Sequence, residues 1–149
     1  MSNRRVAIVT DSTADIPPEL ATSRAITVVP LTLNFDGKSL LDGVEIRPDE
    51  FYRRLPSVTV HPTTSQPSPG RFADVYKSLL SAHDSVVSIH ISQKLSGTYE
   101  SARQAATMTD PKRVHVVDSE LVSMSLGLIT LAASELATSG MDASSIEAK

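Results

Sequence analysis

Three short runs of mostly β-branched residues constrain the fold of this chain more than any other feature. They read VAIV at 6–9, VVSIHI at 86–91 and VHVV at 114–117. Runs of this kind suit strands that are buried on both faces, as in a parallel sheet. A fourth run covers 26–33 but contains Pro30, which cannot donate a backbone hydrogen bond, so it is predicted to be an edge strand or a bulged strand.

Segments with helical periodicity lie between these runs. Apolar residues from Phe72 to Leu80 recur at the spacing of one helix face. Asp15 is a candidate cap for a short helix that starts near Pro17. Further helices are expected at 48–55, 97–108 and 122–136. Strands that alternate with helices predict an α/β fold, a three-layer α/β/α domain with a mainly parallel sheet of about four or five strands.

The length of 149 residues corresponds to about one domain. Leu, Ile, Val and Phe account for 39 residues, enough to form a core without disulfides or metals. We expect the α/β domain to occupy residues 1–140, with Gly140 ending the last long helix. Residues 141–149 resemble the start of a new helix capped by Asp142. This predicts that the chain is one domain of a longer protein and that 141–149 lead to a second domain absent from it.

Composition excludes several classes of protein. The net charge is −3, with 14 basic and 17 acidic residues mixed along the chain, so no nucleic-acid partner is expected. The chain has no cysteine, which excludes disulfides, thiol nucleophiles and cysteine-based zinc sites. The first apolar run is too short for a signal-peptide core, and no stretch approaches the length of a membrane span. We therefore expect a cytoplasmic protein.

Polar groups follow the predicted strands at the edge where parallel sheets bind ligands. Asp11-Ser12 and Asp118-Ser119 each precede a predicted helix, and we interpret both pairs mainly as helix caps. The proline-containing stretch 57–70 is too long for an ordinary connection, so we expect a shaped functional loop that could fold over the same edge.

The tripeptide Ser96-Gly97-Thr98 is a stronger candidate for a binding site. It lies between a predicted strand and a predicted helix, and Gly97 allows a ligand to approach the backbone. The free N–H groups of a first helical turn favour an anion. The spacing alone fits equally well with Ser96 serving as an ordinary helix cap.

No enzyme class is favoured by the residues. The segment around Ser96 lacks the first glycine of a nucleophile elbow, and none of the four histidines has a partner at a recognisable spacing, so they are expected to be structural or exposed. No nucleotide-binding glycine motif and no metal-binding spacing occurs. Serine hydrolysis is therefore not expected, and neither is a cofactor or a metal.

Four motifs, taken together, resemble the DegV family of bacterial fatty acid-binding proteins. They are VTDSTAD at 9–15, TSQPSP at 64–69, LSGTYESA at 95–102 and VDS at 117–119. The resemblance extends from the first strand to at least Leu136. It implies a protein that holds one long-chain fatty acid and presents its carboxylate to a separate fatty acid kinase. That kinase forms an acyl phosphate for phospholipid synthesis. The resemblance also implies that the binding protein itself is not an enzyme and has no catalytic residue, and that its membrane contact is at most transient.

The resemblance also implies a ligand site. Thr64 and Ser96 would donate hydroxyl hydrogen bonds to the carboxylate, and their neighbours in the site would be Thr63, Ser65, Gly97 and Thr98. Members of the family have a second domain that supplies much of the tunnel, so an apolar surface is expected to be left exposed here. The alternative is a regulatory module that binds a different small carboxylate or a phosphate.

Overall fold

Four parallel strands form the central sheet of the computed structural model, which describes residues 6–149. In spatial order they are β2 (Ile26–Val29), β1 (Val6–Asp11), β6 (Ser85–His90) and β7 (Val114–Asp118). Every neighbouring pair is parallel. The parallel sheet predicted from the β-branched runs is therefore confirmed, and β2 is an edge strand as expected.

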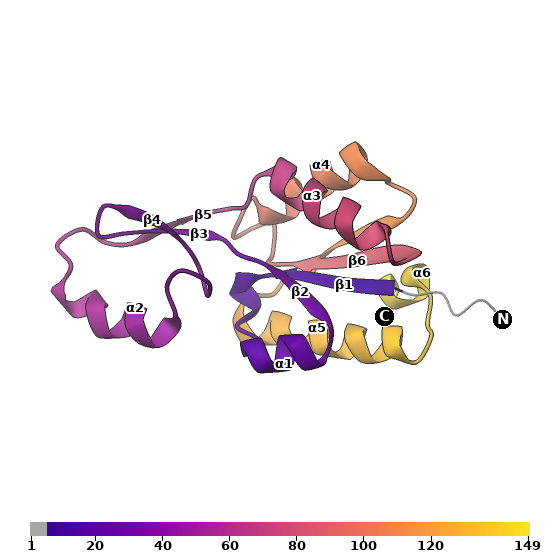
Figure 1. Ribbon diagram of the computed structural model, residues 1–149, viewed down its shortest axis with the longest axis horizontal. Coiled ribbons are helices and arrows are strands. Elements are labelled where there is room, and N and C mark those ends of the chain that lie inside the picture. Colours follow the sequence, from indigo (N-terminus) through magenta and orange to yellow (C-terminus); the bar gives the residue numbers. More distant parts are fainter. Residues whose placement is uncertain (1–5) are drawn as a thin grey trace.

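Helices cover both faces of this sheet and complete the three layers (Figure 1). One face is covered by α3 (Pro69–Leu80) and α4 (Thr98–Thr109), and the other by α1 (Pro18–Ser23), α5 (Ser123–Thr138) and α6 (Ala143–Glu147). The alternation of side chains along β1 sends Val9 toward α3 and α4 and sends Ile8 toward α5. Both faces are apolar, which explains why the strand runs are apolar without interruption.

A second, antiparallel sheet projects from one side of the domain (Figure 1). It consists of β4 (Lys38–Leu41), β3 (Thr32–Phe35) and β5 (Thr63–Ser65), and is accompanied by α2 (Pro48–Arg54) and the 3-10 turn η2 (Leu55–Ser57). It has its own small core of Leu33, Phe35 and Ile46, with Phe51 against it.

The expectation of one strand over 26–33 is wrong, because the chain divides at Pro30 into β2 and β3, which belong to different sheets. Pro30 has no N–H to continue the ladder, and the N–H of Leu31 donates instead to the Ser12 hydroxyl, at 3.1 Å. The stretch 57–70 also differs from a plain loop, since it contains the end of η2 and the short strand β5.

The helix ends follow local backbone chemistry. Asp15 does not cap α1, because it ends the 3-10 turn η1 (Ser12–Ala14) with a left-handed φ of 52°. Gly140 takes a positive φ of 89° just beyond Ser139, the C-cap of α5. The Asp142 carboxylate accepts the Ser145 N–H at 3.0 Å at the start of α6. Within residues 6–149, no helix is long and apolar enough to cross a membrane.

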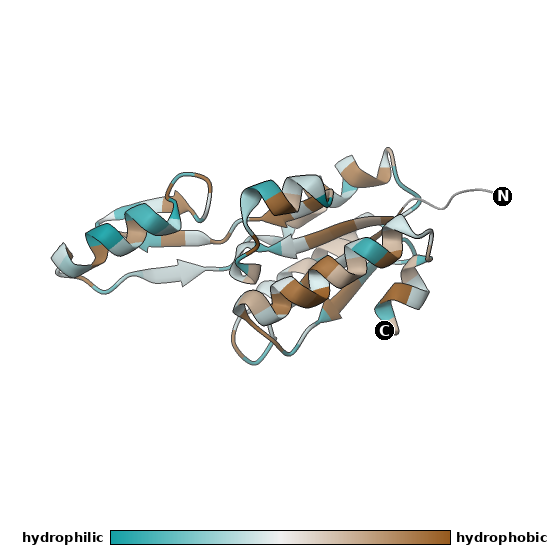
Figure 2. Cartoon of the chain, turned by 90° about the horizontal axis from the view of Figure 1, so that it is seen from below, coloured by the Kyte–Doolittle hydropathy of each residue, from teal (hydrophilic) through white to brown (hydrophobic). Residues whose placement is uncertain are grey.

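Helix α5 exposes part of its apolar surface. Figure 2 views the molecule from the side of α1 and α5, and apolar segments are visible along the helices there. Leu128 is 61% exposed, and Met124 and Ile129 are also exposed. Leu121 and Val122, in the segment before α5, are exposed as well.

Candidate functional site

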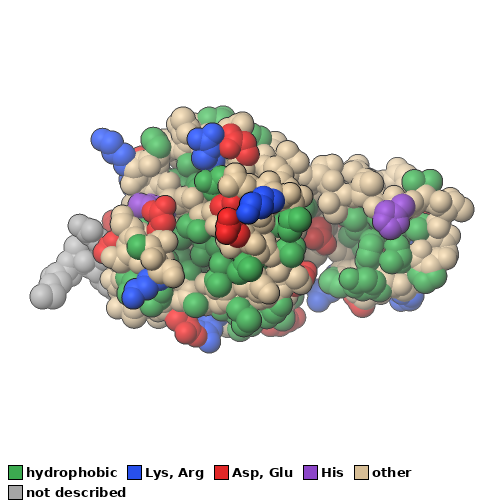
Figure 3. Space-filling model, turned by 180° about the vertical axis from the view of Figure 1, so that it is seen from behind, with side chains coloured by type: hydrophobic (Ala, Val, Ile, Leu, Met, Phe, Trp, Pro, Cys, Tyr) green, Lys and Arg blue, Asp and Glu red, His purple; other side chains and the backbone are tan. Residues whose placement is uncertain are grey.

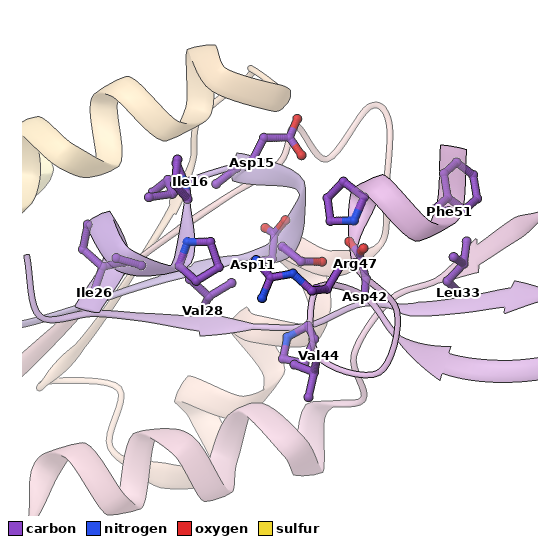
Figure 4. A pocket seen from close by; sticks show the side chains of 18 of the residues that line it. Asp11, Asp15, Ile16, Ile26, Val28, Leu33, Asp42, Val44, Arg47 and Phe51 are labelled. Atoms are coloured by element: carbon purple, nitrogen blue, oxygen red, sulfur yellow. The ribbon is translucent and has the colours of Figure 1, made fainter. Parts of the chain in front are cut away.

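A cavity of about 830 Å³ lies where the carboxyl end of β1 faces the antiparallel sheet. Its walls are largely apolar, with contributions from Ile16, Ile26, Val28, Leu33 and Phe51 (Figure 4). Seen from behind, the molecule is hollowed between its larger and smaller parts (Figure 3). The division of the chain at Pro30 creates this hollow, because it sends β3 away from the sheet to which β2 belongs.

Carboxylates surround the inner end of the cavity. Asp11, Asp15 and Asp42 line it together with Arg47 (Figure 4). Burial raises the pKa of Asp42, and the nearby charges of Asp15 and Asp11 raise it further, although a hydrogen bond with Ser12 opposes the shift. Asp15 accepts a hydrogen bond from the Ser123 hydroxyl at 2.6 Å. This end of the cavity is therefore polar and negatively charged.

Asp11 is the most buried of these carboxylates. Its Oδ1 accepts the N–H of Thr13 at 3.1 Å, and its Oδ2 accepts the N–H of Ile91 at 3.1 Å and a hydrogen bond from His90 Nδ1 at 2.9 Å. Burial raises the pKa of Asp11, but these hydrogen bonds outweigh burial and lower it below its usual value. Asp11 is thus a cap of η1, as predicted, and it also holds a buried histidine that sequence reasoning left without a partner.

Asp118 has a different role from the one predicted. It accepts the N–H groups of Gln93 and Glu120, both at 3.1 Å, and so connects the segment after β6 to the segment after β7. The expectation that it caps α5 is wrong, because α5 begins at Ser123 and its N-cap is Val122, which has no side-chain hydrogen bond there.

Ser96 lies in the turn that starts α4. Its Oγ accepts the N–H of Thr98 at 3.2 Å and is 2.9 Å from the Thr98 hydroxyl. Gly97 occupies the N-cap position, so α4 starts one residue later than expected. The Ser96 hydroxyl is half-buried, whereas Thr98 is fully buried.

The segment 63–68 packs against this turn. A methyl group added to Gly97 would lie 2.5 Å from the Gln66 side-chain nitrogen, so the two segments are in direct contact. Thr64 is exposed on β5, opposite Leu33 of β3, and lines the cavity. Thr63 and Ser65 point to the other face of β5 because side chains alternate along a strand, and Ser65 accepts a hydrogen bond from Asn34 at 3.3 Å.

The predicted site residues therefore fall into three groups. Thr64 lies in the cavity wall, and Ser96, Gly97 and Thr98 lie in the neighbouring turn, outside the residues that line the cavity in the described part of the chain. Thr63 and Ser65 face away from Thr64. Among residues 6–149, no cluster of three or more His, Cys, Asp or Glu could hold a metal ion.

Comparisons with known proteins agree with the motifs. A family model described as an uncharacterised protein of the DegV family matches residues 5–149. A DegV domain-containing protein of Caldanaerobacter subterraneus is 45% identical over 136 residues, which are 91% of this chain and 48% of that protein. The protein DegV of Bacillus subtilis is 38% identical over 135 residues, again 91% of this chain and 48% of that protein.

Solved structures share the same fold. A DegV family protein from Thermus thermophilus, described by its fatty acid binding, superposes with a TM-score of 0.89 at 43% identity, and the match covers 97% of this chain and 51% of that one. DegV from Bacillus subtilis, described as a fatty acid binding protein, superposes with a TM-score of 0.91 at 34% identity, with 97% and 52% covered. The chain thus spans about half the length of the relatives it matches.

Proposed function

The chain belongs to the DegV family, and on that basis we propose that it forms part of a protein that binds one long-chain fatty acid. The similar structures from Thermus thermophilus and Bacillus subtilis, both described as binding fatty acids, support this proposal. The observation that carries it within this chain is the contact between Gln66 and Gly97. That contact brings two motifs, far apart in sequence, to one edge of the sheet.

Thr64 and Ser96 are the proposed donors to the fatty acid carboxylate. A lone carboxylate needs hydrogen bonds from oriented donors more than it needs several cations, and hydroxyls on a strand and at a helix start provide them. Gly97 and Thr98 are proposed neighbours of the carboxylate, and the Thr98 N–H holds the Ser96 hydroxyl in place. Thr63 and Ser65, the other two expected neighbours, would act by shaping β5, since their side chains leave it on the other face.

We propose that the bound carboxylate is presented to a separate fatty acid kinase, which transfers a phosphoryl group to it and forms an acyl phosphate for phospholipid synthesis. The binding protein would then contribute no catalytic group. We further propose a cytoplasmic location, and a second domain that follows residues 141–149 and closes the fatty acid site.

Native mass spectrometry of the full-length protein as purified tests the ligand. A bound mass in the fatty acid range is the expected result. A bound small carboxylate or phosphate would favour the alternative of a regulatory module. The kinase step is tested separately by mixing the loaded protein with a fatty acid kinase and ATP, where acyl phosphate should form only when both proteins are present.

A further inference from the structure

Four buried side chains form a continuous chain of hydrogen bonds between α3 and the cavity. The Tyr76 hydroxyl is 2.8 Å from Ser88 Oγ, Ser88 Oγ is 2.7 Å from His90 Nε2, and His90 Nδ1 is 2.9 Å from Asp11 Oδ2. All four residues have 0% exposure. The imidazole of His90 also packs edge-on against Phe72 of α3, with 5.0 Å between ring centres. This series of hydrogen bonds, together with the ring contact to Phe72, holds the His90 imidazole in place.

Only one placement of the protons lets every donor in this series of hydrogen bonds donate to a neighbour. Asp11 accepts at both oxygens, so its partner His90 must donate from Nδ1. Burial raises the pKa of Tyr76, which stays protonated and donates to Ser88. The Ser88 hydroxyl is then free to donate to Nε2 of His90. Each donor thus points toward Asp11.

The order Ser88, His90, Asp11 is that of a hydrolytic triad, but its orientation is reversed. In such a triad the serine faces the substrate and the aspartate is remote from it. Here Asp11 is equally buried but lies next to the cavity, whereas Ser88 lies away from it, against Tyr76. A substrate cannot reach the serine, so the arrangement orients Asp11 rather than activating a nucleophile.

Asp11 joins the two segments that form the edge of the sheet. One of its oxygens holds Thr13, in the segment after β1, and the other holds the N–H of Ile91, where the chain leaves β6 toward Ser96. The carboxylate can make both contacts in only one orientation. The hydrogen bond from His90 selects that orientation.

We propose that His90 is a positioning residue for ligand binding, which orients Asp11 and thereby sets the spacing between the cavity wall after β1 and the Ser96 turn after β6. The effect on ligand affinity rests on the proposed function. The tautomer of His90 and the hydrogen bonds of Asp11 are independent of the proposed function, so they can be tested without any ligand.

Two variants of His90 separate positioning from packing. In His90→Asn the amide nitrogen lies near the position of Nδ1 and can still donate to Asp11, whereas in His90→Gln it lies near the position of Nε2 and reaches Ser88 instead. Both remove an imidazole from the core, and both should lower the melting temperature. Only His90→Gln should shift the amide resonances of Thr13 and Ile91 strongly. Only His90→Gln should also weaken oleic acid binding by about tenfold, because the Ser96 turn would no longer be held at its spacing from the cavity wall, and a loss of this size is within the range seen for residues that do not contact the ligand.

The full-length protein serves for these measurements, by ¹⁵N NMR and by calorimetric titration with oleic acid. Equal losses of affinity in the two variants, or unshifted Thr13 and Ile91 amides in His90→Gln, would overturn the positioning role. The ¹⁵N shifts of the unmodified imidazole give a reading even where a variant does not fold: a proton on Nδ1 supports the proposal, and a proton on Nε2 alone overturns it. If the unmodified protein binds neither oleic acid nor the saturated stearic acid, the proposed function is overturned instead, and the NMR readings still decide the role of His90.

Discussion

Gly127 of α5 lies directly against the backbone carbonyl of Ala14. A methyl group added to Gly127 would be 2.5 Å from that carbonyl oxygen and 2.9 Å from the Met124 sulfur. Helix α5 therefore approaches η1 as closely as the backbone allows, and η1 forms part of the cavity wall through Ser12 and Ala14. The position of this wall depends on a residue without a side chain.

Gly127→Ala is expected to destabilise the domain. The new methyl group would meet backbone, which cannot move aside without shifting η1, and overpacking of this kind costs about 1–3 kcal/mol. Urea unfolding measures the difference. Gly70→Ala is the matched control, because its new methyl group would lie 3.9 Å from the Ser68 hydroxyl, in ordinary contact, and should leave stability unchanged or slightly raised. Equal stability of the Gly127 variant and the original would show that α5 has room to shift.

Ser96→Ala and Thr64→Val are each expected to weaken fatty acid binding by the full-length protein without unfolding it. Each change removes one hydroxyl donor to a charged acceptor, a hydrogen bond worth about 1.5–3 kcal/mol, or roughly 10- to 100-fold in affinity. The effects should not add if both hydroxyls hold the same carboxylate. Calorimetry with oleic acid measures the affinities.

The control for these variants is Thr107→Val, an exposed threonine of α4 whose hydroxyl donates to the carbonyl of Arg103. Its affinity for oleic acid should match that of the original protein. If Ser96→Ala loses about 1 kcal/mol of stability while its affinity is unchanged, Ser96 acts only through its hydrogen bond from the Thr98 N–H.

The central sheet could be predicted because a strand buried on both faces must be apolar at nearly every position. The runs at 6–9, 86–91 and 114–117 meet that requirement and became β1, β6 and β7. The antiparallel sheet escaped prediction, because its strands are three or four residues long and β4 and β5 are largely exposed. Strands of this kind have too few buried positions to show a periodic pattern of apolar residues in the sequence.

The candidate site was predictable only in part. The turn at Ser96 has a local signature, a small hydroxyl residue and a glycine before a helix, and the structure places it there. The pairing of Asp11 with His90 has no local signature, because 79 residues separate them and only the pairing of β1 with β6 brings them together. The alternation of Ser88 and His90 on one face of an apolar strand was the available clue.

Asp42→Asn is expected to stabilise the domain at neutral pH but not in acid. The pKa of Asp42 is raised in the folded state, so on folding it favours the protonated form. The unfolded chain loses this proton near the ordinary pKa of about 3.9, whereas the folded protein loses it at a higher pH. The free energy of unfolding therefore falls as the pH rises from the ordinary pKa to the raised one. The amide carries no charge, so Asp42→Asn avoids this loss of stability.

Thermal melts at pH 3 and pH 7 measure this effect. Asp42→Asn should raise the melting temperature at pH 7 and leave it unchanged at pH 3, whereas Asp74→Asn, on the exposed face of α3, should change it at neither. A gain of the same size at both pH values would attribute the stabilisation to something other than ionisation. If the fatty acid carboxylate binds near Thr64, Asp42→Asn should also strengthen binding, because it removes a negative charge from the same cavity.

Exposed apolar residues on α5 and just before it predict that this chain associates with copies of itself. Leu121, Val122, Met124, Leu128 and Ile129 are all at least 37% exposed, and together they form an apolar strip over residues 121–129 of the sequence. If a second domain covers this strip in the longer protein, the chain of 149 residues alone should self-associate. Leu128 is 61% exposed, so Leu128→Glu should shift the chain toward the monomer at little cost in stability.

Sedimentation velocity across a range of concentrations tests this prediction, with Met108→Glu as the control. Met108 has the same 61% exposure but lies on α4, across the sheet from α5, so its change should not alter association. Sedimentation of the unmodified chain as a monomer at high concentration would contradict the prediction and would favour a domain that needs no cover over α5. Association that only Leu128→Glu disrupts would locate the contact on α5. In the longer protein the same substitution should then lower stability, because it would place a charge in a buried interface.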